Sequence, residues 1–361
     1  MWSVTSLSKN SNNLVASQNS EKAYWGSTRK VRFKSQLYAM VEYVVKNDGQ
    51  NFSKEEFKRL IQEDRSRREY LRLLIMQRGS RKALRTIGGT GEAYEQGVAD
   101  AISFAKTVGL LQVNKNIITC PDNIKNMHSQ IKDKPWIFDA EILRLLLNSK
   151  YKAYINFLKH LQELNGLFCI PKDYKSRSSE SGFPEYLNNQ GFLTDPASFY
   201  TLRDLFYDFG FINWNFNVQE NYEQIYLTCY IAKPEETVSS RYSTKIDLGK
   251  YSLFYNKKIS LKQYEAILSK CYSNLSGGYW GTIIELLKLR DNVCNELRMS
   301  DNQFNQLIIE LWKKKGSAFS VELSQGLVTY EKSSGFLIKG LNAPTIDNDS
   351  YATYIRLFGS N

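Results

Sequence analysis

The side chains best placed to do chemistry are cations gathered in one stretch of the chain. Between residues 65 and 85 they face a single acid, Glu69. The cations are Arg65, Arg67, Arg68, Arg72, Arg78, Arg81, Lys82 and Arg85. A second basic group, formed by Arg29, Lys30, Arg32 and Lys34, follows the aromatic pair Tyr24-Trp25. Guanidinium and ammonium groups at this density suit contact with phosphates, which makes binding steeply salt-dependent. The competing interpretation is a solvated basic face.

A glycine-rich turn follows the basic stretch. Gly88-Gly89-Thr90-Gly91 precedes an expected helix from Glu92. Backbone N–H groups in such a loop can hold a phosphate. The turn lacks the lysine of a nucleotide-binding P-loop, so we do not expect an NTPase site. Gly89 is instead a candidate for close approach of the backbone to a DNA phosphate, with a plain turn between helices as the alternative.

Two short triplets could belong to a nuclease. A Mg²⁺-dependent site pairs carboxylates with a lysine that assists the attacking water. Glu56-Phe57-Lys58 lies in an expected helix, and Asp173-Tyr174-Lys175 follows the apolar run Leu167–Ile170. Because such triplets are common by chance, we assign no catalytic residue.

Metal and thiol chemistry lack the necessary spacing. The two histidines, His128 and His160, are far apart, and the five cysteines form no CxxC pair. A metal site needs clustered ligands. We therefore expect no metal, no cofactor and free buried thiols, as in a reducing compartment.

Three segments share one pattern of elements. Each has an amphipathic helix that ends at a glycine and leads into two short strands joined by a polar turn. They span residues 92–120, 195–229 and 300–330. Further helices are expected at 34–46, 53–77, 139–165, 261–274 and 279–297, and linkers at 121–134, 172–184 and 233–250.

A helix that leads into a hairpin is the second half of a winged helix. We therefore predict a mainly α protein with small β-hairpins, in the α+β class, with tandem winged-helix domains. The expected divisions are an N-terminal arm at 1–33 and domains at 34–130, 131–245 and 246–361. In a winged helix, a helix-turn-helix variant, the third helix can enter the major groove while the hairpin contacts the flanking backbone. The helices from Glu92 and Pro196 are the candidate readers. Lys106, Lys115, Arg203 and Asn213 are candidate groove or backbone contacts.

Composition limits the class of protein. The 361 residues carry a net charge of +11, from 48 basic and 37 acidic residues, and 42% are hydrophobic. This supports packed domains and a polyanionic partner. No apolar run reaches the roughly 20 residues of a membrane span. The N-terminus lacks the apolar core of a signal peptide, so we expect a cytoplasmic protein with no membrane partner.

The first 230 residues resemble the recognition lobe of type IIS restriction and nicking endonucleases. The similarity lies in Trp2–Ser6 with the polar stretch to Leu14, in Tyr24-Trp25-Gly26 before the first helix, and in Ala99–Cys120, which contains Lys106–Leu110. It implies tandem winged helices that read duplex DNA in both grooves. The chain departs from the family at its C-terminal third, which reads as another winged helix rather than a nuclease domain.

We therefore expect a duplex-DNA-binding protein that serves as the sequence-recognition subunit of a restriction or defence system. A separate nuclease or ATPase would then be its partner. The alternatives are a Mg²⁺-dependent endonuclease with an unrecognised site, a plasmid or phage replication initiator, and a scaffold that uses winged helices for protein contacts.

Overall fold

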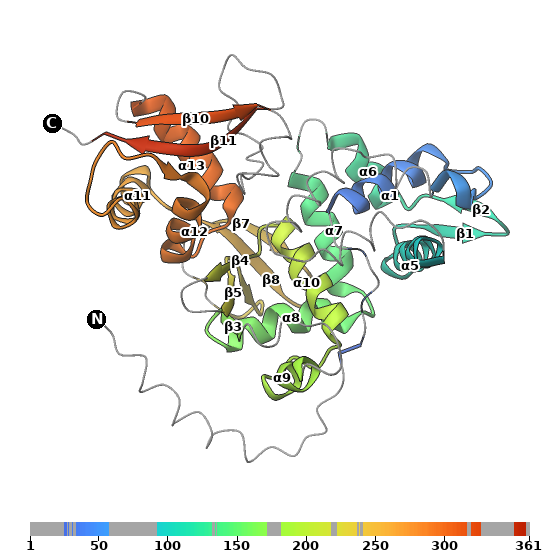
Figure 1. Cartoon of the computed structure of the whole chain (residues 1–361). Helices are drawn as coiled ribbons and strands as arrows, with labels where there is room; N and C mark the ends of the chain where they lie inside the picture. Colours follow the sequence, from blue (N-terminus) through green and yellow to red (C-terminus); the bar gives the residue numbers. More distant parts are fainter. Residues whose placement is uncertain are drawn as a thin grey trace.

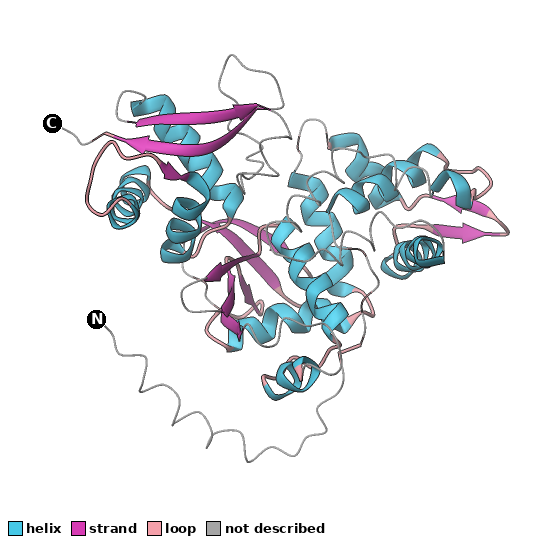
Figure 2. Cartoon of the chain, viewed as in Figure 1, coloured by secondary structure: helices cyan, strands magenta, loops and turns pink. Residues whose placement is uncertain are grey.

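The computed structural model (Figure 1) combines helices with small antiparallel sheets, so the coarse α+β prediction is confirmed (Figure 2). It describes residues 25, 26, 28, 31, 34–57, 92–131, 134, 136–171, 182–217, 222–236, 238, 241–315, 319–325 and 350–358.

The first unit (residues 34–119) contains two long helices and a hairpin. Its elements are α1 (Lys34–Lys46), α5 (Glu92–Val108), β1 (Gln112–Asn114) and β2 (Ile117–Thr119). After α1 the chain forms a bridge from Asn51 to Ile117, and another helical turn begins after Ser53. The segment that follows α1 in the sequence thus pairs with β2 and adds a third, strand-like segment to the hairpin.

The second unit (residues 152–227) repeats this order with longer strands. It consists of α8 (Lys152–Glu163), β3 (Leu167–Pro171), α9 (Phe183–Asn189), α10 (Pro196–Asp208), β4 (Ile212–Asn217) and β5 (Tyr222–Leu227). The sheet order is β3-β5-β4. The strand behind the first helix therefore pairs with the second strand of the hairpin.

The third unit (residues 261–357) has the same order. It consists of α11 (Leu261–Leu275), β9 (Ile284–Glu285), α12 (Leu286–Leu297), α13 (Asp301–Lys315), β10 (Phe319–Gln325) and β11 (Ser350–Leu357). The sheet order β10-β11-β9 again places the strand behind the first helix next to the last strand. The expected partner of β10, Leu327–Tyr330, lies outside the described residues; the strand that pairs with β10 is β11.

The remaining elements lie between the first two units and after the second. α6 (Asp122–Gln130) and α7 (Trp136–Asn148) join the first two units, and a sheet of order β6-β8-β7 follows the second. Its strands are β6 (Tyr230–Ala232), β7 (Tyr242–Asp247) and β8 (Ser252–Lys257). Two predicted linkers, 121–134 and 233–250, thus contain regular structure, and the expected division between 245 and 246 falls within β7.

Two predicted helices are shorter than expected. The helix predicted over 139–165 is divided into α7 and α8, because Ser149 turns its hydroxyl back to the Leu146 carbonyl and Tyr151 leaves the helical region at ψ 84°. The helix predicted from Tyr279 begins only at Leu286, since Gly281 has a φ of 80°.

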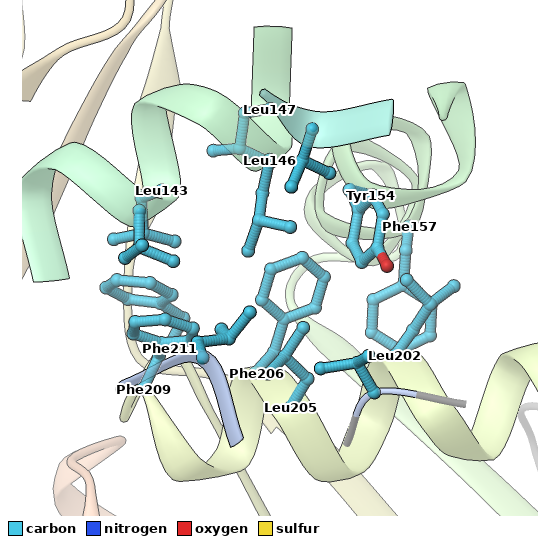
Figure 3. Packing of buried hydrophobic residues seen from close by; sticks show 14 of the residues in the cluster. Leu143, Leu146, Leu147, Tyr154, Phe157, Leu202, Leu205, Phe206, Phe209 and Phe211 are labelled. Atoms are coloured by element: carbon cyan, nitrogen blue, oxygen red, sulfur yellow. The ribbon is translucent and has the colours of Figure 1, made fainter. Parts of the chain in front are cut away.

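One hydrophobic cluster unites the first two units, and a second belongs to the third unit. The large cluster runs from Val31 to Leu253, and the small one from Tyr226 to Leu357. Figure 3 shows Phe206 of α10 among residues of α7 and α8, and its ring stacks on that of Phe157 at 5.8 Å between centroids. Aromatic pairs of this kind add to the stabilisation from burial. The first and second units therefore share a core.

Candidate nucleic-acid interface

Most of the predicted DNA contacts lie outside the described residues. These are Arg29, Lys30, Arg32, Arg65, Arg67, Arg68, Arg72, Arg81, Lys82, Arg85 and Gly89. Their role in binding stays a prediction. The described part of the chain retains four candidate contacts, Lys106, Lys115, Arg203 and Asn213.

The hairpin of the first unit keeps Lys115 at an exposed tip. Lys115 and Asn116 both adopt positive φ, 48° and 66°, as a two-residue hairpin turn requires. Lys106 is also exposed, with its ammonium 5.8 Å from the centre of the Phe52 ring. In Figure 1 the hairpin projects from the molecule at the end opposite to β10 and β11. Both lysines are therefore accessible to a polyanion.

Arg203 of α10 lies in the interior, so its predicted contact with DNA is wrong. The side chain is 7% exposed and pairs with Asp204 at 2.7 Å and with Glu223. Its guanidinium also lies 4.0 Å from the centre of the Trp214 ring. Asn213 is buried as well. The helix from Pro196 therefore cannot read DNA from this position: of the residues of α10, all of which are described, only Ala197 is exposed.

Described residues near the N-terminus contact α10 near both of its ends. The Thr28 N–H donates to the Ser198 hydroxyl at 2.7 Å, and the Lys34 N–H donates to the Asp208 carboxylate at 2.6 Å. The Trp25 ring packs against Phe192 just before the helix. We call the described residues Trp25, Thr28, Val31 and Lys34 the N-terminal strap; Thr28 and Lys34 bind the first and last turns of α10.

The third unit closes the C-terminal end of α10. Asp301, in the first turn of α13, accepts hydrogen bonds from the Tyr207 hydroxyl and from the Asn213 amide, the latter at 2.7 Å. The Arg290 guanidinium lies 3.1 Å from the same carboxylate. This buried polar network fixes the third unit against the second.

The third helix of the third unit presents a polar face. Asn302, Gln306 and Lys313 are exposed, whereas Phe304 and Ile308 are fully buried. At 3.6 residues per turn, these three residues lie within about 40° of one another around the helix axis, and the exposed Glu310 lies about 40° beyond Gln306. The polar face could have been found in the sequence, because polar residues recur opposite the apolar stripe of this helix. Our predictions instead named the helices from Glu92 and Pro196 as the ones that read DNA bases.

Exposed aromatic residues lie elsewhere on the third unit. Tyr279 is 74% exposed and Trp280 is 48% exposed, although Trp280 stacks on Tyr272 at 5.6 Å. Trp280 therefore stays partly accessible to solvent. Trp25, by contrast, is half-buried.

The other candidates for chemistry take structural roles where they are described. His160 packs against Phe192, and its Nε2 lies 2.7 Å from the Gln190 carbonyl oxygen. Burial raises the pKa of the Cys120 thiol to about 11 and that of Cys229 to about 12. Neither thiol ionises near neutral pH, so neither is an activated nucleophile. Asp173–Lys175 lies outside the described residues.

Metal ligands do not cluster in the described ranges, where no group of three or more His, Cys, Asp or Glu side chains could hold an ion. No helix in those ranges has the length and apolar character needed to cross a membrane. Neither a family model, nor a curated protein, nor a solved structure matches the chain.

Proposed function

We propose that the chain is a duplex-DNA-binding protein built from three winged-helix units, in which α13 of the third unit enters the major groove. The observation that carries this proposal is the exposed polar face of α13, the helix that precedes the antiparallel strands β10 and β11 in the chain. The repeated order of helix, strand, helix, helix, strand and strand supports it, since the third helix of a winged helix is the one that reads bases.

The side chains of α13 have the chemistry for reading base edges. Asn and Gln amides form paired hydrogen bonds with the N6 and N7 atoms of adenine, and a lysine ammonium donates to guanine or to phosphate. Asn302, Gln306 and Lys313 display these groups along one side of the helix. The major groove, about 12 Å wide, admits an α-helix.

The first unit would supply contacts with the DNA backbone. Its hairpin carries Lys115 at the tip, and Lys106 is exposed on the preceding helix. The basic stretch between residues 65 and 85 belongs to the same part of the sequence, and the net charge of +11 favours a polyanion. The resemblance to restriction endonucleases suggests a cytoplasmic defence system, in which a separate nuclease or ATPase acts on the DNA.

Selection of bound fragments from random duplex DNA, followed by a salt titration, tests the proposal. We expect one enriched sequence and a clearly negative slope of log affinity against log salt. A slope near zero would contradict duplex binding and would favour a protein scaffold. Enrichment of repeated origin sequences would instead identify a replication initiator.

Two further measurements separate binding from cleavage and test the basic stretch. Incubation with Mg²⁺ and plasmid leaves the DNA intact if the chain only binds, whereas an endonuclease cuts it.

Reversal of Arg67, Arg68, Arg81 and Lys82 to Glu should abolish binding while the melting temperature stays nearly unchanged. Unchanged affinity would remove these residues from the interface.

A further inference from the structure

The third unit exposes an apolar surface at the loop that follows α11. Seven large hydrophobic side chains are exposed among the described residues, and five of them lie in or beside this loop. We call these five the apolar patch: Leu275, Tyr279, Trp280, Ile283 and Phe358. In Figure 1 the loop lies at the end of the molecule away from the first unit. Exposed apolar patches of more than a few hundred Å² mark interaction sites on soluble proteins.

Backbone hydrogen bonds hold the parts of the apolar patch together. The Gly278 N–H donates to the Ser273 carbonyl at 2.8 Å, which folds the loop back on the end of α11. The Gly281 N–H donates to the Leu357 carbonyl at 2.7 Å and brings the loop beside the end of β11, where Phe358 follows. The two segments therefore form one surface.

The two aromatic rings of the loop are held in place within the chain. Trp280 stacks on the buried Tyr272, with 5.6 Å between ring centroids and 23° between ring planes, and the Tyr272 hydroxyl donates to the Thr282 carbonyl. The Tyr279 ring lies beside Gly277, where an added Cβ would be 3.8 Å from the Tyr279 Cδ2 atom. Because the rings are already ordered, a partner that binds them causes little further loss of conformational entropy.

The loop carries no charge, although the chain has a net charge of +11. Residues 271–284 contain no Asp, Glu, Lys or Arg. The charged residues at both borders are paired within the chain, Lys270 with Glu296 at 2.6 Å and Glu285 with Lys288 at 3.2 Å. The loop therefore offers no cation to a phosphate and no charge for an acidic partner to complement.

A second copy of the chain has the matching chemistry, because its patch is equally apolar and uncharged. Two such patches can meet without like-charge repulsion at the contact. Repulsion between the more distant charges of two cationic copies is largely screened beyond about 8 Å at physiological salt.

The area of the patch is also sufficient for contact between two copies. Its five side chains are 37–74% exposed. With about 150–250 Å² for a whole aromatic side chain and less for Leu and Ile, the exposed surface amounts to roughly 500 Å². Two patches face to face would bury about 1,000 Å², the lower limit for a specific protein–protein interface. Tyr and Trp are the side chains that most often dominate binding at such interfaces.

We infer that two copies of the chain associate through the apolar patch, with Tyr279 and Trp280 of each copy against the same loop of the other. A two-fold contact uses the same surface on both copies, so one patch per chain is enough and the assembly closes at two. The dimer depends on protein concentration, because its interface is small. This contact goes beyond DNA binding and does not require it.

Sedimentation equilibrium of the full chain without DNA tests the inference, over protein concentrations from about 1 to 100 μM, the range for a small interface. We expect the mass to rise with concentration to twice that of one chain and no further. Tyr279→Asp removes one exposed ring and places like charges in the contact, and Trp280→Ser removes the other ring. Each should weaken the dimer about tenfold or more. Trp136→Ser is the matched control, since Trp136 is 59% exposed on α7, outside the patch, and it should leave the dimer unchanged.

Salt separates this contact from one driven by charge. Apolar association should not weaken when salt is raised from about 0.1 to 0.5 M, whereas association through charges does. Dissociation of the dimer by salt would contradict the inference.

Three other outcomes overturn the inference. These are a wild type that stays monomeric over the whole range, an assembly that grows beyond two copies, and equal weakening of the dimer by Trp136→Ser. Loss of duplex affinity in Trp280→Ser, without self-association of the wild type, would assign the patch to DNA bases instead. An unchanged melting temperature of Tyr279→Asp, expected for so exposed a position, shows that loss of the dimer is not misfolding.

Discussion

The second and third units have the same order of elements, but the outer face of the third helix is buried in the second unit and exposed in the third. In α10 the outer positions hold Tyr200, Arg203 and Tyr207, which are buried against neighbouring parts of the chain. In α13 the outer positions hold Asn302 and Gln306, which face solvent. In Figure 1 the second unit lies between the other two, whereas α13 belongs to a unit at one end.

The comparison teaches that the order of elements alone does not decide which third helix is exposed to a partner. The N-terminal strap and the third unit both contact α10, and its long side chains, each with a polar end, pair with them or with its own sheet. We therefore interpret the second unit as the part that holds the others in place. Changes in α10 should alter stability, and changes in α13 should alter affinity.

The largest effect is expected from Arg203→Ala. The substitution leaves the buried Glu223 carboxylate without its guanidinium, and breaking a buried ion pair in this way costs about 3–5 kcal/mol of unfolding free energy. Urea denaturation measures the loss. Lys313→Ala, an exposed change on α13, is the control and should stay within about 0.5 kcal/mol of the wild type. Equal losses in the two variants would break the comparison.

A smaller effect on a different property is expected from Asn302→Ala and Gln306→Ala. Each removes an amide from the exposed face of α13, so each should weaken binding to the selected duplex by about 1–3 kcal/mol and relax its preference at one base pair. Competition binding with single-base variants of the site measures both changes. Ala197→Ser, at the exposed position of α10, is the matched control. Loss of affinity in that control would restore α10 as a reader.

The smallest effect concerns the pH dependence of stability, through Lys257. The pKa of Lys257 is about 8 in the folded chain, below its ordinary value of 10.5, so the folded state holds fewer protons between these two values. Stability should therefore rise with pH across this window, by less than about 1 kcal/mol because solvent reaches the side chain. Unfolding measured at pH 7 and pH 10 tests the sign. Lys257→Gln should abolish its contribution to the rise, and an undiminished rise would assign the effect to another group.

The hairpins and the helix ends could be predicted from the sequence because their signals are local. Gly109 and Gly210 both adopt positive φ at the helix ends where they were expected, and Asp195 caps α10 by accepting the Ser198 N–H. Ser300 likewise accepts the Gln303 N–H. Such contacts join residues a few positions apart, so they can be predicted from the types of these residues.

These local signals did not predict the strands that follow the first helix of each unit, nor the burial of α10. β9 has two residues, too few for any alternation to show, and β3 reads as a short apolar run that a buried helix would share. The burial of Arg203 depends on its contacts with Glu223 of β5 and Trp214 of β4. Hydrophobic periodicity does not predict that these residues lie next to α10. A helix covered by distant parts of the chain resembles an exposed one in its sequence.

The N-terminal strap also bears on how the protein is made. Its hydrogen bonds to Ser198 and Asp208 join residues 170 and 174 positions apart. At a translation rate of about 5–20 residues per second, the strap leaves the ribosome roughly 9–35 s before its docking surface does. Until then Val31, which is buried in the folded chain, is exposed to chaperones and to misfolding. The N-terminal strap of the newly made chain therefore reaches its docked position only after the second unit has been synthesised.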